Sequence, residues 1–180
     1  EEIQPAGSGT FIVCKEGMYG VVDAQGNEVL PFKFTNLYFN PDAFGEGDAV
    51  FVAWSPQGAY IFDQQWEELF SSALYTSIQV SEGVMIATDR EEHRHLLDAD
   101  GKEIISAVVG MYWNEEVQLG VCQHSLDSGT ACYTRDGVKA VLPPCDSSAP
   151  VASDRFIIMK EQPDGSFLYG LCDAKGNIIL

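Results

Sequence analysis

Short apolar runs alternate with short polar stretches along the whole chain. The first pair of runs covers 10–15 and 19–23, and the second covers 49–54 and 59–63. These runs are rich in Val, Ile, Phe and Tyr, and Gly, Asp and Pro separate them. Such runs are typical of antiparallel β-strands rather than helices. The same pattern predicts three more pairs of strands, at 84–88 and 94–98, at 119–123 and 131–134, and at 155–160 and 167–173.

A single polar residue ends the second run of every pair and marks a repeat. These residues, which we call the turn residues, are Asp23, Asp63, Asp98, Thr134 and Asp173. Successive turn residues are 40, 35, 36 and 39 positions apart. A period of this size is typical of an array in which each structural unit buries its apolar face against its neighbours.

Each turn residue precedes a tight turn, and the third residue of that turn is glycine in four of the five units. These glycines are Gly26, Gly101, Gly137 and Gly176, and Trp66 takes the place in the second unit. Glycine suits the positive φ that hairpin loops need. The Asp carboxylate is expected to accept hydrogen bonds from the amides two and three residues on. We therefore predict a structural role for all of these turn aspartates and glycines.

Further apolar runs follow each turn, so each unit is predicted to be a meander of three or four strands. A third strand is expected at 28–30, 67–70, 103–105 and 140–142, and a weaker fourth at 34–39, 74–80 and 108–113. The predicted fold is all-β, with five tandem antiparallel strand-meander repeats of about 35–40 residues in a single domain over 1–180. The units span roughly 10–43, 44–80, 81–116, 117–153 and 154–180.

The five units are compatible with a propeller-like ring or with an open β-solenoid. The last unit lacks a fourth strand, and the N-terminal segment 1–9 is able to supply it, as in a propeller that is closed by its own terminus. Against this role, the segment is polar and only Ile3 in it is clearly apolar. We favour the ring over the solenoid.

The units resemble those of the bacterial WG-repeat family. The family pattern is an aromatic-Gly pair, an apolar pair with Asp, a turn that contains Gly, an apolar run and Pro. Its matches here are Tyr19-Gly20, Asp23, Gly26 and Pro31 in the first unit, and Tyr169-Gly170, Asp173 and Gly176 in the last. The Trp of the namesake pair is absent, and the middle units replace the pair by Ala59-Tyr60, Arg94-His95 and Thr130-Ala131. The resemblance implies a non-enzymatic repeat module, often found in exported or multidomain bacterial proteins, and supplies no catalytic residues.

The chain is strongly acidic. Ten Lys and Arg residues stand against 27 Asp and Glu, which gives a formal net charge of -17. Such a surface repels phosphate backbones and anionic lipid, so we expect neither a nucleic-acid partner nor membrane insertion. The chain begins at Glu1 without an initiator Met, and we expect a segment of an exported or cell-surface protein.

Three features raise the question of metal or redox chemistry. His93 and His95 are able to contact one ion if both lie on a strand, whereas a hairpin loop gives them no such role. The stretch 98–101 opens like a calcium loop but lacks the later ligands. Cys122 and Cys132 are placed to form a disulfide across a hairpin, although buried free thiols are the default expectation. We predict no metal and no cofactor.

The tryptophans are the candidate binding residues. Trp54 and Trp66 flank the same hairpin, and Trp66 lies in a turn, where an aromatic side chain is hard to bury. We therefore predict that both bind a partner, with Trp66 exposed, and that Trp113 belongs to the core. The predicted function is a non-catalytic module that binds or scaffolds a protein or a cell-envelope component. The alternatives are a carbohydrate-binding or glycan-active domain that uses Trp66 and acidic residues, and a structural spacer of a longer protein.

Replacing Gly26 or Gly176 by Val should lower the free energy of unfolding by about 1–3 kcal/mol, because each glycine is predicted to hold a left-handed turn conformation. Thermal denaturation of both variants beside the parent protein measures the effect. Midpoints within error of the parent for both variants would contradict the turn assignment.

Overall fold

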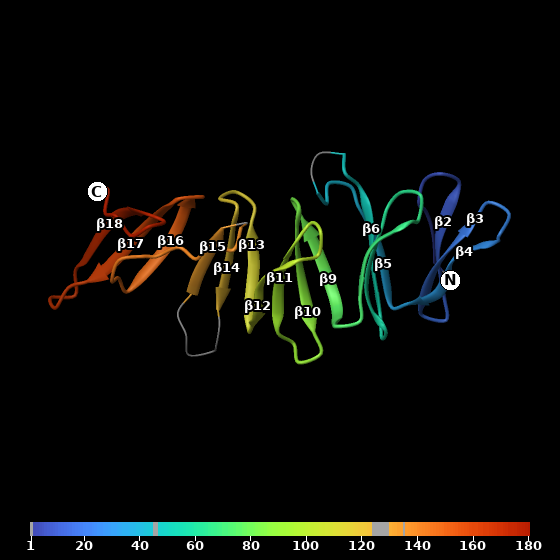
Figure 1. The fold of residues 1–180 in the computed structure, drawn as a ribbon, viewed down its shortest axis with the longest axis horizontal. Helices are drawn as coiled ribbons and strands as arrows, with labels where there is room; N and C mark the ends of the chain where they lie inside the picture. Colours follow the sequence, from blue (N-terminus) through green and yellow to red (C-terminus); the bar gives the residue numbers. More distant parts are fainter. Residues whose placement is uncertain (1, 45–46, 124–129, 135) are drawn as a thin grey trace. The chain divides into compact units, whose positions relative to one another are not determined.

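The structure is a computed structural model that describes residues 2–44, 47–123, 130–134 and 136–180. Within these residues the backbone forms 18 strands in five antiparallel sheets and no helix (Figure 1). The prediction of an all-β fold built from five strand meanders is therefore confirmed. The described part of the chain accordingly has no helix with the length and apolar character needed to cross a membrane.

The chain divides into two compact units, Glu1–Ser106 and Ala107–Leu180, and the single domain over 1–180 stays a prediction. The first sheet consists of β1 (Glu2–Pro5), β2 (Thr10–Lys15), β3 (Met18–Asp23) and β4 (Glu28–Phe34). The second consists of β5 (Asn36–Asn40), β6 (Val50–Ser55), β7 (Gly58–Phe62) and β8 (Glu68–Ser72). The third consists of β9 (Tyr75–Ser81), β10 (Val84–Asp89), β11 (Arg94–Asp98) and β12 (Glu103–Val108). Strands that follow each other in the sequence are neighbours in each sheet.

The second compact unit holds two sheets of three strands each. The fourth sheet consists of β13 (Gly110–Asn114), β14 (Leu119–Gln123) and β15 (Thr130–Thr134). The fifth consists of β16 (Ser147–Ala152), β17 (Arg155–Glu161) and β18 (Phe167–Asp173). After the turn that follows the last strand, each of these two sheets has a single β-bridge, between Tyr133 and Lys139 and between Cys172 and Ile178.

Each sheet begins one strand earlier than the predicted sequence unit. The weak fourth runs overlap β5, β9 and β13, which pair with the next strand along the chain and so open the following sheet. The N-terminal segment behaves in the same way, because β1 pairs with β2 and places Ile3 opposite Val13. The predicted role of this segment as the missing strand of the last unit is therefore wrong. Its backbone hydrogen bonds complete the first sheet instead.

The turns have the backbone conformation that the glycines predict. The φ values are 84° at Gly26, 80° at Gly101, 77° at Gly137 and 86° at Gly176. Trp66 has a φ of 68°, so it adopts the same left-handed conformation despite its side chain. In all five turns the amide of this third residue donates to the carbonyl of the turn residue at 2.9–3.1 Å.

The two residues before each turn residue point to opposite faces of their sheet and build the cores between sheets. We call the face with the second residue before the turn residue the forward face, and the face with the residue immediately before it the backward face. Val21 on the forward face of the first sheet and Phe62 on the backward face of the second are buried in one cluster. Ile61 and Leu97 meet in the same way between the second and third sheets. In the second sheet, Ile61 thus packs against the third sheet, and the next residue, Phe62, packs against the first.

The second compact unit follows the same rule. Cys132, on the forward face of the fourth sheet, shares a buried cluster with Cys172, on the backward face of the fifth. Leu119 and Phe156 complete this core and are almost fully buried. Removal of these apolar side chains from water is the main favourable contribution to the stacking of one sheet on the next.

Replacing Gly58 by Ala should lower the free energy of unfolding by at least about 2 kcal/mol, as measured by urea denaturation. A Cβ atom at Gly58 would lie 2.3 Å from the carbonyl oxygen of Ser72, and the backbone there has a φ of 153°. Gly110→Ala is the matched control, because its Cβ would meet only Gln123, at an ordinary 3.9 Å. The control should change the stability by less than about 1 kcal/mol. Equal losses in the two variants would contradict the close approach at Gly58.

Candidate functional site

The turn aspartates bind the backbone of their own turns. The Oδ1 atom of Asp23 accepts hydrogen bonds from the amides of Gln25 and Asn27 at 2.9 and 2.8 Å. The same two bonds recur at Asp63, Asp98 and Asp173. The carboxylate therefore accepts from the second and fourth residues, and the predicted bond from the third residue is wrong. The third amide bonds the backbone carbonyl of the turn residue instead, because the left-handed conformation turns it that way.

Two of these turns have a further hydrogen bond from a side chain. Asn27 Nδ2 donates to Asp23 Oδ2 at 2.8 Å, and Asn177 Nδ2 donates to Asp173 Oδ2 at 2.7 Å. This bond is the largest of the interactions that hold the pKa of each Asp below its ordinary value, followed by the bond from the amide of the same Asn. These two carboxylates are thus occupied in closing their turns.

The turn between β10 and β11 repeats the arrangement at a place that the sequence period does not mark. Asp89 Oδ1 accepts hydrogen bonds from the amides of Glu91 and His93 at 2.9 and 2.8 Å. Glu92, the third residue after Asp89, has a φ of 67°. The one sequence signal for this turn is that Asp89 ends an apolar run, as the turn residues do.

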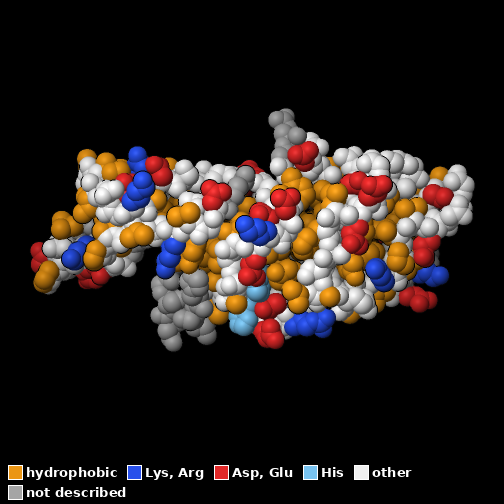
Figure 2. All heavy atoms as spheres, viewed as in Figure 1, with side chains coloured by type: hydrophobic (Ala, Val, Ile, Leu, Met, Phe, Trp, Pro, Cys, Tyr) orange, Lys and Arg blue, Asp and Glu red, His pale blue; other side chains and the backbone are white. Residues whose placement is uncertain are grey.

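Two histidines lie beside this turn, and both approach the second oxygen of Asp89. His93 is in the loop, with its Nδ1 atom 3.5 Å from Asp89 Oδ2. His95 is on β11, with its Nε2 atom 3.1 Å from Asp89 Oδ2 and its Nδ1 atom 2.7 Å from Glu103 Oε2. Figure 2 shows the pale blue His side chains next to red carboxylates. Each ring nitrogen of His95 is thus within hydrogen-bonding distance of a different carboxylate.

The cluster is partly buried, and this sets its electrostatics. Burial raises the pKa of Asp89, but hydrogen bonds from His95 and from the amides of His93 and Glu91 outweigh it, so the pKa lies below its ordinary value. Burial also raises the pKa of Tyr75, whose ring centroid is 5.2 Å from that of His95, and the nearby charges of Glu103 and Asp89 add to this effect.

Among the residues that the structure describes, one group of three side chains in this loop could hold a metal ion. Ligand atoms of Asp89, Glu91 and His93 lie within 4.8 Å of one another. One imidazole with two carboxylates is a ligand set for a divalent transition metal. The same contacts also serve as the internal bonds of a hairpin turn, and the absence of a metal stays a prediction.

Trp66 is buried, so the prediction that its side chain is exposed is wrong, and its role in binding stays a prediction. Its side chain is 8% exposed and stacks on Phe51 with a centroid distance of 4.0 Å. Its Nε1 atom donates to Thr10 Oγ1 in the first sheet at 3.1 Å. The turn lies at the contact between the first and second sheets, and this neighbour, distant in sequence, covers the indole.

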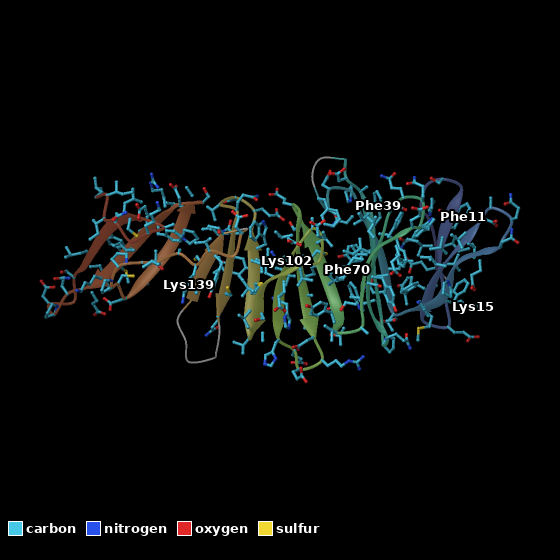
Figure 3. All side chains as sticks on the ribbon, viewed as in Figure 1. Phe11, Lys15, Phe39, Phe70, Lys102 and Lys139 are labelled. Carbon is cyan, nitrogen blue, oxygen red and sulfur yellow. The ribbon has the colours of Figure 1, made fainter. Side chains whose placement is uncertain are left out.

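An exchange of large and small residues explains why Trp replaces Gly at this place. At the contact between the second and third sheets, Phe70 fills the space next to Gly101, whose Cβ would lie 2.6 Å from the Phe70 ring. Figure 3 labels Phe70 at this contact. At the contact between the first and second sheets, the smaller Leu30 takes the place of Phe70, and Trp66 takes the place of Gly101. The indole occupies the space that the shorter side chain leaves.

The other two tryptophans also pack inside the fold. Trp54 is half-buried on β6, packs against the cluster between the second and third sheets, and makes an edge contact with Tyr38 at 6.0 Å between centroids. Trp113 is buried on β13, as expected of a core residue. The geometry therefore gives Trp54 a role in packing, and a role in binding stays a prediction.

All five cysteines are free. Cys122 lies opposite Ala131 and Cys132 lies opposite Val121, so the two cysteines point to opposite faces of the fourth sheet. Burial is the main cause that raises the pKa of the Cys122 thiol to about 11. The possible disulfide between them is therefore not formed, and the loop 124–129 that joins them lies outside the described residues.

The forward face of the fifth sheet exposes residues that the first sheet buries at the same places. Ile157 lies opposite Leu171, as Ile12 lies opposite Val21 in the first sheet. Ile12 and Val21 are buried, whereas Ile157 is 42% exposed and Leu171 is half-buried. The sequence alone does not show this face, because it does not show toward which neighbouring sheet each apolar residue points.

Three further apolar residues extend this exposed face. Phe167 and Tyr169 alternate with Leu171 in the β17–β18 register, and Tyr169 is 69% exposed. Leu180 takes the place of Leu30 in the repeat and is 87% exposed. Figure 2 shows hydrophobic side chains at the surface over β16–β18. Exposed apolar surface of this kind marks sites of interaction.

A comparison with known families identifies the repeat. Residues 19–42 match the family described as WG containing repeat. One unit of the chain thus matches the WG repeat. The match begins at Tyr19 and includes the turn at Asp23 and Gly26, which are the residues that carried the resemblance in the sequence. No curated protein matches the chain in sequence.

Several solved structures are similar to this chain. The computationally designed Ika8 protein is 13% identical, with 99% of this chain and 59% of that chain covered and a TM-score of 0.44. KlHsv2 with loop 6CD replaced by a Gly-Ser linker is 10% identical, with 99% and 63% covered and a TM-score of 0.48. A eukaryotic initiation factor is 12% identical, with 91% and 48% covered and a TM-score of 0.48. The chain thus spans less than two thirds of the length of each of these structures.

Replacing Trp66 by Gly should lower the free energy of unfolding by about 2–4 kcal/mol, because the loss of a buried aromatic side chain outweighs the relief of backbone strain. Leu30→Phe should recover about 1 kcal/mol in the Trp66→Gly protein and nothing in the parent protein. Urea denaturation of the two single variants and the double variant measures this coupling. Additive effects would contradict the exchange of large and small residues.

Proposed function

We propose that this chain is a non-catalytic repeat module that binds a protein partner through the forward face of its fifth sheet. The supporting observation is the exposure of Ile157, Tyr169 and Leu180 on a face whose counterparts pack against a neighbouring sheet elsewhere in the chain. A face with this pattern is suited to contact a flat apolar surface such as another sheet.

The composition of the face specifies the chemistry of the partner. Its centre is apolar and aromatic, and Glu161 lies opposite Phe167 at the end of β17. Protein interfaces commonly combine an apolar centre with a polar rim and are rich in Tyr and Phe. Glu161 at the edge of the face favours a partner whose apolar patch has a basic side chain at its own edge, because complementary charge speeds encounter and selects partners.

The two alternative functions have less support from the geometry. A carbohydrate site built on Trp66 needs an accessible indole for stacking on a sugar ring, and this indole is covered by Phe51 and the first sheet. A pure spacer needs no exposed packing face. A protein partner accounts for the aromatic and aliphatic residues of the fifth sheet together.

The proposal predicts that selection from a displayed library of random peptides yields binders to this face. The selected peptides should combine apolar and basic residues, and Tyr169→Asp should weaken their binding by about tenfold or more, as loss of a central aromatic contact does. The measurement is the dissociation constant of each selected peptide for the parent protein and the variant.

Tyr112→Asp is the matched control, because Tyr112 is an exposed tyrosine on β13, outside the face. Peptide binding should survive this change. Failure to select any peptide that depends on Tyr169, or retention of glycans instead of peptides on an array, would contradict the proposal.

A further inference from the structure

We propose that the forward face of the fifth sheet binds the backward face of the first sheet of a second copy of this chain, which gives head-to-tail assembly. This inference rests on the proposed function and names its partner. It follows from the packing rule within the chain, where forward faces meet backward faces at each contact that the buried clusters define.

The backward face of the first sheet is apolar and incompletely covered. Phe11 and Val22 lie opposite each other on it, at the places of Phe51 and Phe62 in the second sheet. Phe51 and Phe62 are almost fully buried, whereas Phe11 and Val22 are only half-buried. Figure 3 labels Phe11 on the first sheet.

Ile3 and Val13 enlarge this face. They lie opposite each other on β1 and β2, and Ile3 is 65% exposed. The chain therefore has one uncovered forward face, on the fifth sheet, and one half-covered backward face, on the first sheet. Both faces carry apolar residues at the places that pack against a neighbouring sheet elsewhere in the chain. Because the two faces differ, the contact is heterologous, and such contacts build rings or open chains of copies.

Charged residues at the strand ends complement this pairing. β2 ends at Lys15, which lies on the same face as Phe11, and β17 ends at Glu161, which lies on the same face as Ile157. The overall charge of -17 opposes the approach of two copies. Salt screens repulsion over distances of about 10 Å at 0.1 M, so the assembly should strengthen as ionic strength rises.

Sedimentation velocity of the full chain over a range of concentrations tests the inference in high salt. The parent protein should self-associate reversibly. Ile157→Glu and Ile3→Glu, each at an exposed place on one of the two faces, should each weaken self-association by about tenfold or more. Tyr112→Glu should leave it unchanged. Thermal denaturation establishes that each variant is folded before the comparison is made.

A mixture of the two face variants gives the sharpest result. Ile157→Glu leaves the backward face intact and Ile3→Glu leaves the forward face intact, so the mixture should form a pair of one copy each that does not grow further. A parent protein that is monomeric at every concentration would overturn the inference. So would loss of association through Ile157→Glu alone with Ile3→Glu unaffected, since that pattern indicates contact between two identical faces.

The result is separable from the test of the proposed function. If the parent protein stays monomeric while selected peptides still bind at Tyr169, the partner is not a second copy, and this inference fails while the proposed function stands. If neither self-association nor peptide binding depends on the face, both fail.

Discussion

The contact between the forward face of one sheet and the backward face of the next is the interaction on which the structure depends. Neighbouring residues on a strand point to opposite sides, so Ile61 and Phe62 serve two different cores although they are adjacent in the sequence. Each sheet is narrow and has little interior of its own. Burial between sheets therefore supplies most of the apolar contact that stabilises it. An array built in this way leaves a packing face wherever a sheet lacks a neighbour.

The turns keep this stacking in register. A carboxylate that binds two amides of its own turn fixes the chain direction after the strand. At Gly101 and Gly176 the third turn residue also lies close to the preceding unit. Glycine suits these two places because the backbone has a positive φ there and little room is left for a side chain. Phe70 lies beside Gly101, and a Cβ atom at Gly176 would lie 3.1 Å from the carbonyl oxygen of Val141. Trp66 departs from the rule where Leu30 leaves space, and stacking on Phe51 with a hydrogen bond to Thr10 offsets its local strain.

The local features of the fold could be predicted from the sequence, and the non-local ones could not. Strand positions and the left-handed turns follow from short apolar runs and from Asp and Gly at fixed spacing, which depend on neighbours in the chain. Each weak fourth run could pair with the strand before it or with the strand after it. The apolar pattern of β5 or β9 is the same in both cases, so the sequence does not show to which sheet the run belongs. The burial of Trp66 depends on Leu30 and Thr10, far away in the sequence. The histidine cluster depends on Glu103, which joins it from the next strand.

Hydroxyl-radical footprinting of the dilute native protein, read by mass spectrometry, measures the accessibility of the packing residues directly. The account predicts slow oxidation at Ile61 and Phe62, which lie in the inner cores, and fast oxidation at Tyr169 and Leu180 on the uncovered face. Fast oxidation at Ile61, or protection of Tyr169 and Leu180 in the dilute protein, would contradict the stacking of forward on backward faces.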